Sequence, residues 1–215
     1  MKPPPIPGFA APSLRDRAAA QRIRRLAAAV ACVGILAFVS LIVFFVVGGP
    51  FGFVNDVSNA VLATLAGMLA ATWLRATRQR SPWLSLATAT ALAGTVAAVV
   101  GSAMVIFDLT GYFLAGLVSA SGFALVGTWM IAANLSARKP AAIGSSRPQT
   151  ILGVVTGSVT TVGLVNVPGI VMGIDDQGAA PLWLLAAGPC WAGTYVLMPI
   201  WCLRLTRMPP RLVPP

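Results

Sequence analysis

The chain has 215 residues, of which 57% are hydrophobic and only 9% are charged, and its mean hydropathy is +0.84. A soluble fold of this length cannot bury so much apolar side chain, so the composition excludes a soluble globular domain and indicates a protein that lies in lipid. Lys and Arg together number 15 against five acids, which gives a net charge of +10. Such a surplus often indicates nucleic-acid binding, but here the basic residues lie only between apolar stretches, so we expect no nucleic-acid partner.

Residues 1–25 are expected to form a cytoplasmic Pro-rich tail and a basic juxtamembrane segment. Four of the first seven residues are proline, which predicts a disordered tail over residues 1–12. Ser13 is a candidate cap for a short helix, after which five arginines lead into the first apolar stretch. We expect these arginines to lie along anionic headgroups, so membrane lipids are the expected partners of this face.

Six apolar stretches follow, and each is long enough to cross a bilayer as a helix. None shows the period-two alternation of transmembrane strands. The stretches lie at about residues 26–48, 57–74, 83–107, 112–135, 151–174 and 182–203. The sequence therefore predicts an all-α integral membrane protein with a bundle of six transmembrane helices over residues 26–203 and a short basic tail over residues 204–215.

The charges of the connections alternate, and this predicts the orientation of the chain. All 15 cations lie in the N-terminal segment, the C-terminal tail and every second connection, whereas the other connections hold Asp56, Asp108, Asp175 and Asp176. Because Lys and Arg are retained in the cytoplasm, both termini are expected to be cytoplasmic. Frequent Ala, Gly and Arg with few Lys is typical of GC-rich bacterial genomes, so the expected location is a bacterial plasma membrane.

Aromatic residues near the ends of the apolar stretches agree with this orientation, because amphipathic rings favour the membrane interface. Trp73, Trp83 and Trp201 lie near the inner ends, and Tyr112 and Trp183 near the outer ends.

An internal repeat is a further hypothesis. Three of the apolar stretches carry a small residue, Thr and an aromatic toward the cytoplasm, at Ala71-Thr72-Trp73, Gly127-Thr128-Trp129 and Gly193-Thr194-Tyr195. This pattern predicts three parallel helical hairpins. The alternative is that short matches arise by chance among helices dominated by Ala, Gly, Thr and Val.

The absence of His and Glu from the sequence limits the possible chemistry. HExxH metalloproteases, bis-His haem proteins and Ser-His proteases all need residues that this chain lacks. A retinal Schiff base is also excluded, because the two lysines lie outside the apolar stretches. The cysteines, Cys32, Cys190 and Cys202, all lie in apolar stretches, where a thiol behaves as a small hydrophobe. We therefore expect no enzymatic activity, no catalytic or metal site and no cofactor.

A group of polar residues toward the outer side is the best candidate for a site: Asn55, Asp56, Asn59, Asp108, Asn166 and Asp175. Asn55 and Asn59 are one helical turn apart, and Asn166 precedes a Pro-Gly break. One interpretation is a vestibule that binds a cation or a polar solute. The alternative is structural, with the asparagines bonding across helices and Asn55 or Asp56 capping the second helix.

Small residues recur at every fourth position, which predicts close helix contacts within the bundle or between copies of the chain. The rows are Ala89-Ala93-Ala97-Gly101, Thr90-Gly94-Ala98-Ser102, Gly116-Ala120-Ala124 and Gly153 with Gly157.

The leading functional hypothesis is a non-enzymatic scaffold or accessory subunit, which would have a membrane protein or a second copy of the chain as its partner. The alternative is a small transporter or channel-like protein for a neutral or polar solute. A transporter should contain a continuous polar path, whereas a scaffold should have a dry core of small residues.

Overall fold

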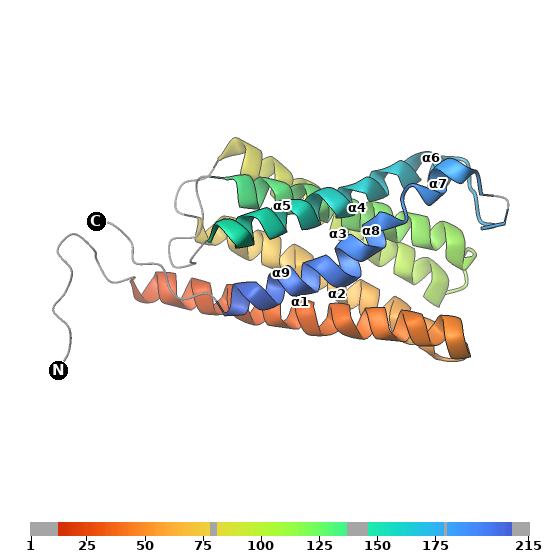
Figure 1. Cartoon of the computed structure of the whole chain (residues 1–215), viewed down its shortest axis with the longest axis horizontal. Helices are drawn as coiled ribbons and strands as arrows, with labels where there is room; N and C mark the ends of the chain where they lie inside the picture. Colours follow the sequence, from red (N-terminus) through yellow and green to blue (C-terminus); the bar gives the residue numbers. More distant parts are fainter. Residues whose placement is uncertain (1–12, 78–80, 137–145, 179, 208–215) are drawn as a thin grey trace.

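A computed structural model describes residues 13–77, 81–136, 146–178 and 180–207 (Figure 1). The tail expected over residues 1–12 and most of the C-terminal tail lie outside the described residues. The described segments are helical and contain no strand. Their helices are α1 (Leu14–Val47), α2 (Phe51–Ala76), α3 (Pro82–Ile106), α4 (Tyr112–Leu135), α5 (Arg147–Thr161), α6 (Val167–Val171), α7 (Leu182–Leu185), α8 (Pro189–Ala192) and α9 (Met198–Thr206).

Six segments of this fold are long and apolar enough to cross a membrane. Helices α1 to α4 supply one each. The fifth, Arg147–Val171, joins α5 to α6 through the 3-10 turn η1 (Val162–Asn166). The sixth, Leu182–Thr206, runs through α7, α8, the π-helical turn η2 (Gly193–Leu197) and α9. The predicted all-helical architecture, with six segments long and apolar enough to span a membrane, is thus confirmed.

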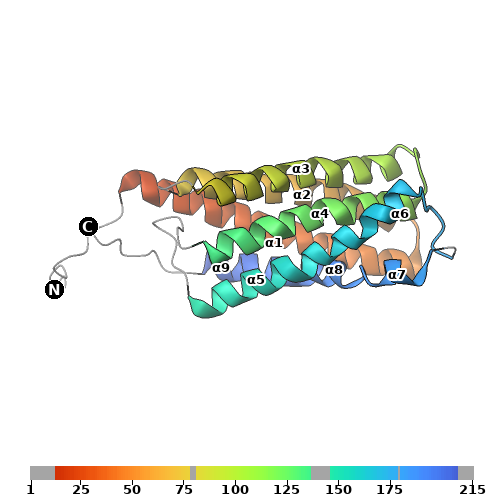
Figure 2. The ribbon, with the colours of Figure 1, turned by 90° about the horizontal axis from the view of Figure 1, so that it is seen from above.

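The six segments form a closed ring in chain order. The most extensive contacts join α1 to α2, α2 to α3, α3 to α4 and α4 to α5, and α9 then contacts both α5 and α1. Figures 1 and 2 show the first turn of α1 and the last turn of α9 at the same end of the bundle. We call this the basic end, because Arg75, Arg147 and Arg204 lie there at helix termini, and the opposite end, with Asp108 and Asp175, the acidic end.

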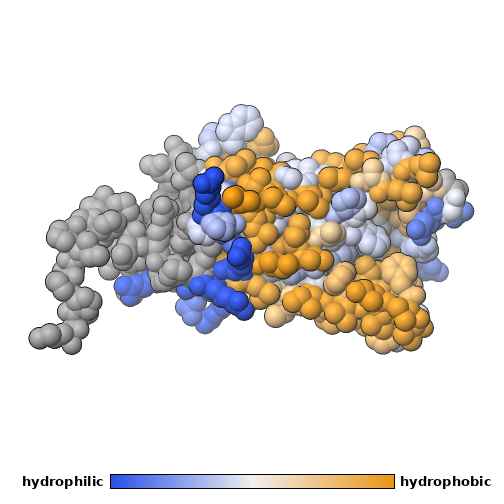
Figure 3. Space-filling model, viewed as in Figure 1, coloured by the Kyte–Doolittle hydropathy of each residue, from blue (hydrophilic) through white to orange (hydrophobic). Residues whose placement is uncertain are grey.

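The outer surface between the two ends is apolar. Large hydrophobic side chains face outward from the helices, with Leu36 of α1 51% exposed and Val96 of α3 63% exposed. Figure 3 shows hydrophobic residues over the length of the bundle and hydrophilic residues gathered at its ends. An apolar belt of this kind is unfavourable in water and matches the hydrocarbon interior of a bilayer.

Helix α1 is one continuous element of 34 residues. Ser13 caps it as predicted, since its hydroxyl oxygen accepts a hydrogen bond from the Asp16 N–H at 3.2 Å. The expectation of a separate short helix before the membrane is wrong, because no break separates this cap from the apolar span. At about 1.5 Å per residue α1 is about 51 Å long, which exceeds a hydrocarbon core of about 30 Å, so its first turns extend beyond the span.

Glycines allow the central helices to approach closely. A Cβ atom on Gly94 would collide with the Gly122 carbonyl of α4, and one on Gly157 would lie 2.6 Å from the Gly127 carbonyl. The predicted helix contacts at Gly94 and Gly157 are therefore confirmed. Other positions of the rows make no contact within the bundle: Ala89 and Ala93 are exposed on α3, and Gly116 faces open space, so contact between copies of the chain stays a prediction for them.

Proline breaks the regular hydrogen bonding of the last two segments. Pro168 follows the 3-10 turn of the fifth segment, and Pro189 separates α7 from α8 in the sixth. Pro199 cannot donate to the Tyr195 carbonyl, and the chain before it is π-helical. The sixth segment is therefore the least regular of the six.

Candidate functional site

Two of the predicted outer residues meet in a buried hydrogen-bonded chain. The Asn59 amide nitrogen donates to the Asn55 side-chain oxygen at 2.9 Å, within one turn of α2. The Tyr195 hydroxyl then donates to the Asn59 side-chain oxygen at 2.8 Å, from η2 in the sixth segment. Both asparagines are buried. These two hydrogen bonds connect the sixth segment to α2 across the bundle.

Asn55 and Asp56 do not cap a helix. Helix α2 begins at Phe51 with Pro50 in the cap position, so both residues lie inside its second turn, and the capping interpretation is wrong. Asp56 makes no hydrogen bond to another described residue. Asp56 adjoins Asn55 on α2 but takes no part in the Asn55–Asn59–Tyr195 hydrogen bonds.

Asp108 ends α3. Its φ angle is +53°, in the left-handed region that glycine usually occupies at this position. The Asp108 N–H donates to the Val105 carbonyl at 3.0 Å, and the Leu109 N–H donates to the Met104 carbonyl at 2.8 Å. These two bonds form a Schellman motif, so Asp108 serves the turn between α3 and α4.

Asp175 caps α4 from a distant part of the sequence. Its two carboxylate oxygens accept hydrogen bonds from the Gly111 N–H at 2.6 Å and from the Leu114 N–H at 3.0 Å. The Tyr112 hydroxyl adds a bond to the Gln177 side chain at 3.2 Å. A carboxylate at a helix N-terminus satisfies free amides and interacts favourably with the helix dipole. Asp175 therefore fixes the loop after α6 to the start of α4.

Asn166 lies at the end of η1, which packs against α4. It is buried, yet its side chain makes no hydrogen bond to another described residue. Of the six predicted residues, the recorded hydrogen bonds thus join only Asn55 and Asn59 to each other. Sequence reasoning missed Tyr195, although a tyrosine hydroxyl in an apolar span needs a partner and could have been paired with a nearby asparagine.

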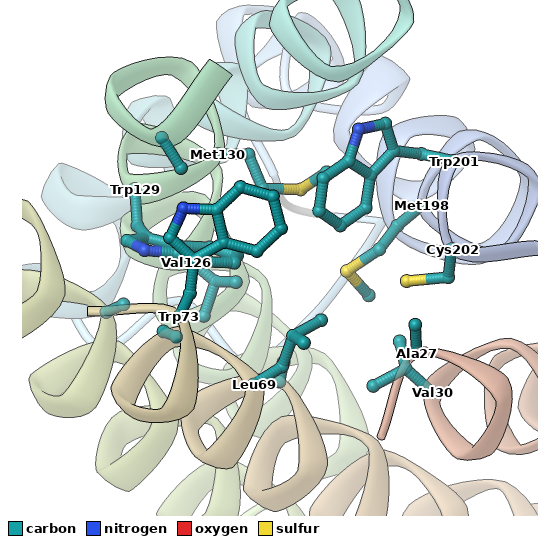
Figure 4. Close-up of a cluster of buried hydrophobic side chains, with 14 of the residues drawn as sticks. Ala27, Val30, Leu69, Trp73, Val126, Trp129, Met130, Met198, Trp201 and Cys202 are labelled. Carbon is teal, nitrogen blue, oxygen red and sulfur yellow. The ribbon is translucent and has the colours of Figure 1, made fainter. Parts of the chain in front are cut away.

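Three tryptophans fill the interior toward the basic end (Figure 4). Trp73 of α2, Trp129 of α4 and Trp201 of α9 have ring centroids 6.2 to 6.4 Å apart, and two of the three pairs are edge-to-face. Their exposed fractions are 2% or less, so the interfacial placement expected for Trp73 and Trp201 is wrong. Trp83, by contrast, is 77% exposed. We call the three buried indoles the tryptophan cluster.

The surroundings of the cluster are apolar. Leu69, Met130 and Met198 surround the rings (Figure 4). None of the three indole N–H groups has a hydrogen-bond partner within the described residues. The tryptophan cluster is therefore held by packing rather than by hydrogen bonds.

Buried threonines of the fifth and sixth segments bond their hydroxyls locally. Thr156 donates to the Leu152 carbonyl at 2.7 Å, Thr160 to the Thr156 carbonyl at 2.8 Å and Thr194 to the Cys190 carbonyl at 3.0 Å. Each of these bonds stays within one helix. The buried hydroxyls therefore support the bundle without forming a chain of free polar groups.

The fold and these contacts define the class of the protein as a multi-pass membrane helix bundle. Comparisons with protein-family models, curated proteins and solved structures found no match for the chain.

Proposed function

We propose that this chain is a non-enzymatic scaffold or accessory subunit of a bacterial plasma membrane. The observation that carries the proposal is the tryptophan cluster, which occupies the interior where a solute path would have to pass. The lack of His and Glu removes the usual groups for acid-base and metal chemistry. The apolar belt leaves a large surface for contact with a membrane-protein partner or a second copy of the chain.

The orientation belongs to the same proposal. The basic end faces the cytoplasm, both termini are cytoplasmic, and the arginines there contact anionic headgroups. The three segments that run toward this end, α2, α4 and Leu182–Thr206, then each close one of three parallel hairpins.

Reporter fusions test this orientation. Reporters placed after residues 78, 143 and 210 should be cytoplasmic, and those after residues 52, 110 and 177 should be external. An external reporter after residue 143 would contradict the proposed orientation.

The scaffold role is tested by crosslinking the full-length chain in native membranes before purification in detergent. A membrane protein should be recovered in constant proportion to the chain, and proteoliposomes that hold the chain alone should show no solute flux. Flux that depends on the chain would contradict the proposal.

Two features favour the alternative of a transporter or channel-like protein. The sixth segment is broken at Pro189 and η2, and irregular helices line solute sites in many transporters. The Asn55–Asn59–Tyr195 chain lies beside this break and offers polar atoms. On this alternative, Tyr195→Phe would reduce flux in proteoliposomes, whereas a scaffold would show none in either form.

A further inference from the structure

A groove runs along the outer face of α2 in the half of the bundle toward the basic end. It lies between α1 and α3 and has a volume of about 320 Å³. Arg22 of α1 and Arg75 of α2 line it, together with Thr72. Its other lining residues include Met68, Ala71 and Leu92. The groove thus carries its positive charge on side chains that belong to the basic end.

The wall away from the arginines is apolar in character. Gly67 and Ala71 are small, and a Cβ on Gly67 would lie 2.5 Å from the Thr95 hydroxyl, so α2 and α3 approach closely there. The hydroxyl groups of the other two threonines are already bonded to backbone: Thr95 donates to the Ala63 and Ala91 carbonyls, and Thr64 donates to the Ala60 carbonyl. This part of the groove suits a hydrocarbon chain.

Three donors that bond to no described residue lie at the other part of the groove. Arg22 and Arg75 are exposed and form no ion pair or hydrogen bond with another described residue. Thr72 is only 8% exposed, and its hydroxyl likewise has no partner among the described residues. A phosphate group supplies acceptor oxygens and negative charge for two guanidinium groups and a hydroxyl.

The length of the groove matches one leaflet of a bilayer. At about 1.5 Å per residue, the stretch of α2 between Thr64 and Arg75 covers about 16 Å. Half of a hydrocarbon core about 30 Å thick is about 15 Å. A lipid whose phosphate lies at Arg75 would therefore extend its acyl chain along the apolar wall toward Thr64.

We propose that this groove binds one anionic phospholipid from the leaflet at the basic end, with its phosphate between Arg22 and Arg75 and an acyl chain along Ala71, Met68 and Leu92. Thr72 donates its free hydroxyl to the phosphate. The site makes the headgroup contacts of the proposed function specific to one groove. It requires only that the bundle lies in a bilayer, so it holds for a scaffold and a transporter alike.

The test uses the full-length chain purified in detergent and titrated with dioleoyl-phosphatidylglycerol or with dioleoyl-phosphatidylcholine. Native mass spectrometry counts the retained lipids, and the thermal midpoint reports stabilisation by binding. Arg22→Gln and Arg75→Gln remove the charges, and Arg204→Gln is their control because it lies at the basic end outside the groove. Ala71→Leu places a larger side chain in the apolar part of the groove. Gly116→Leu is its control, because Gly116 faces open space.

The wild type should retain one phosphatidylglycerol more firmly than phosphatidylcholine, and inorganic phosphate should not displace it. Each groove arginine removed should weaken phosphatidylglycerol binding about fivefold, and Ala71→Leu should weaken the binding of both lipids. Both controls should bind as the wild type does. Midpoints measured without lipid identify any variant that is misfolded, and Arg75→Lys, which keeps the charge, should restore much of the binding.

Three results would overturn the proposal. An equal loss in Arg204→Gln would show general attraction to the basic end, and unchanged binding in Ala71→Leu would show that the lipid lies elsewhere. A change in oligomeric mass in Ala71→Leu with unchanged lipid retention would assign the groove to a second copy of the chain.

Discussion

The contact between α4 and α5 at Gly127 and Gly157 gives a direct test of how tightly the bundle is packed. We expect Gly157→Ala to destabilise the protein although alanine is the better helix former. The added Cβ would lie 2.6 Å from the Gly127 carbonyl oxygen, 2.8 Å from Ile131 Cγ1 and 2.9 Å from the Ile131 nitrogen. Two of these three atoms belong to the backbone, so rotation of a side chain cannot relieve the overlap.

The magnitude follows from the balance of two effects. Ordinary contacts of a Cβ begin at 3.4 Å. The helices must therefore separate by most of an ångström along the direction from the new Cβ to the Gly127 carbonyl oxygen. Overpacking of this kind costs about 1 to 3 kcal/mol, and it opposes a gain of about 1 kcal/mol from replacing glycine within a helix. Gly116→Ala has the same gain without the overlap, because nothing lies within 4 Å of its Cβ position.

Thermal unfolding in detergent measures both variants against the wild type. The unfolding midpoint of Gly157→Ala should lie below that of Gly116→Ala by an amount equivalent to about 1 to 3 kcal/mol. Each kcal/mol corresponds to about 2 to 4 °C for a soluble domain of this length. Equal midpoints for the two variants would refute the reasoning, because they would show that α4 and α5 are not in close contact at Gly157.

The other predictions concern the polar residues. Asn59→Leu leaves both Asn55 and the Tyr195 hydroxyl without their partner and should cost about 1 to 3 kcal/mol, more than Tyr195→Phe, which leaves only the Asn59 oxygen unpaired. Equal midpoints of the two variants in thermal unfolding would contradict the bonded chain. Asp175→Ala removes the cap of α4 and should cost about 0.5 to 2 kcal/mol, and hydrogen exchange should increase at Gly111 and Leu114. Unchanged exchange at these two amides would show that Asp175 does not cap the helix.

The membrane-spanning segments could be predicted from composition because their signal is local. An apolar run such as residues 112–135 contains the whole of α4, and no distant residue is needed to recognise it. The start of α2 was harder, since Asn55 and Asp56 resemble capping residues. Pro50 and the turn Gly48-Gly49 start the helix earlier, and both glycines have positive φ angles.

The candidate site was predictable only where its contacts are local. The Asn55–Asn59 bond follows from helical spacing, whereas the Tyr195–Asn59 bond joins residues 136 positions apart and depends on how the ring of helices closes. The sequence pattern groups Asp108 and Asp175 by charge and expected depth. Their actual partners are backbone amides and carbonyls, which the sequence pattern does not distinguish from a ligand.

Burial of Trp73 and Trp201 could not be predicted from their places near the ends of apolar stretches. An indole at this depth is equally suited to the interface and to the core, and the choice depends on which face of the helix it occupies. Here Trp129 supplies the third ring, which packs edge-to-face against both Trp73 and Trp201.

The tryptophan cluster also gives the protein an optical property. Three indoles with centroids 6.2 to 6.4 Å apart share their excited states, so they should produce a coupled near-ultraviolet circular dichroism band and fluoresce as a group. Trp83, Trp183 and Trp191 are exposed and should emit independently of the cluster. The chain therefore carries its own light-absorbing reporter of the junction where α2, α4 and α9 meet.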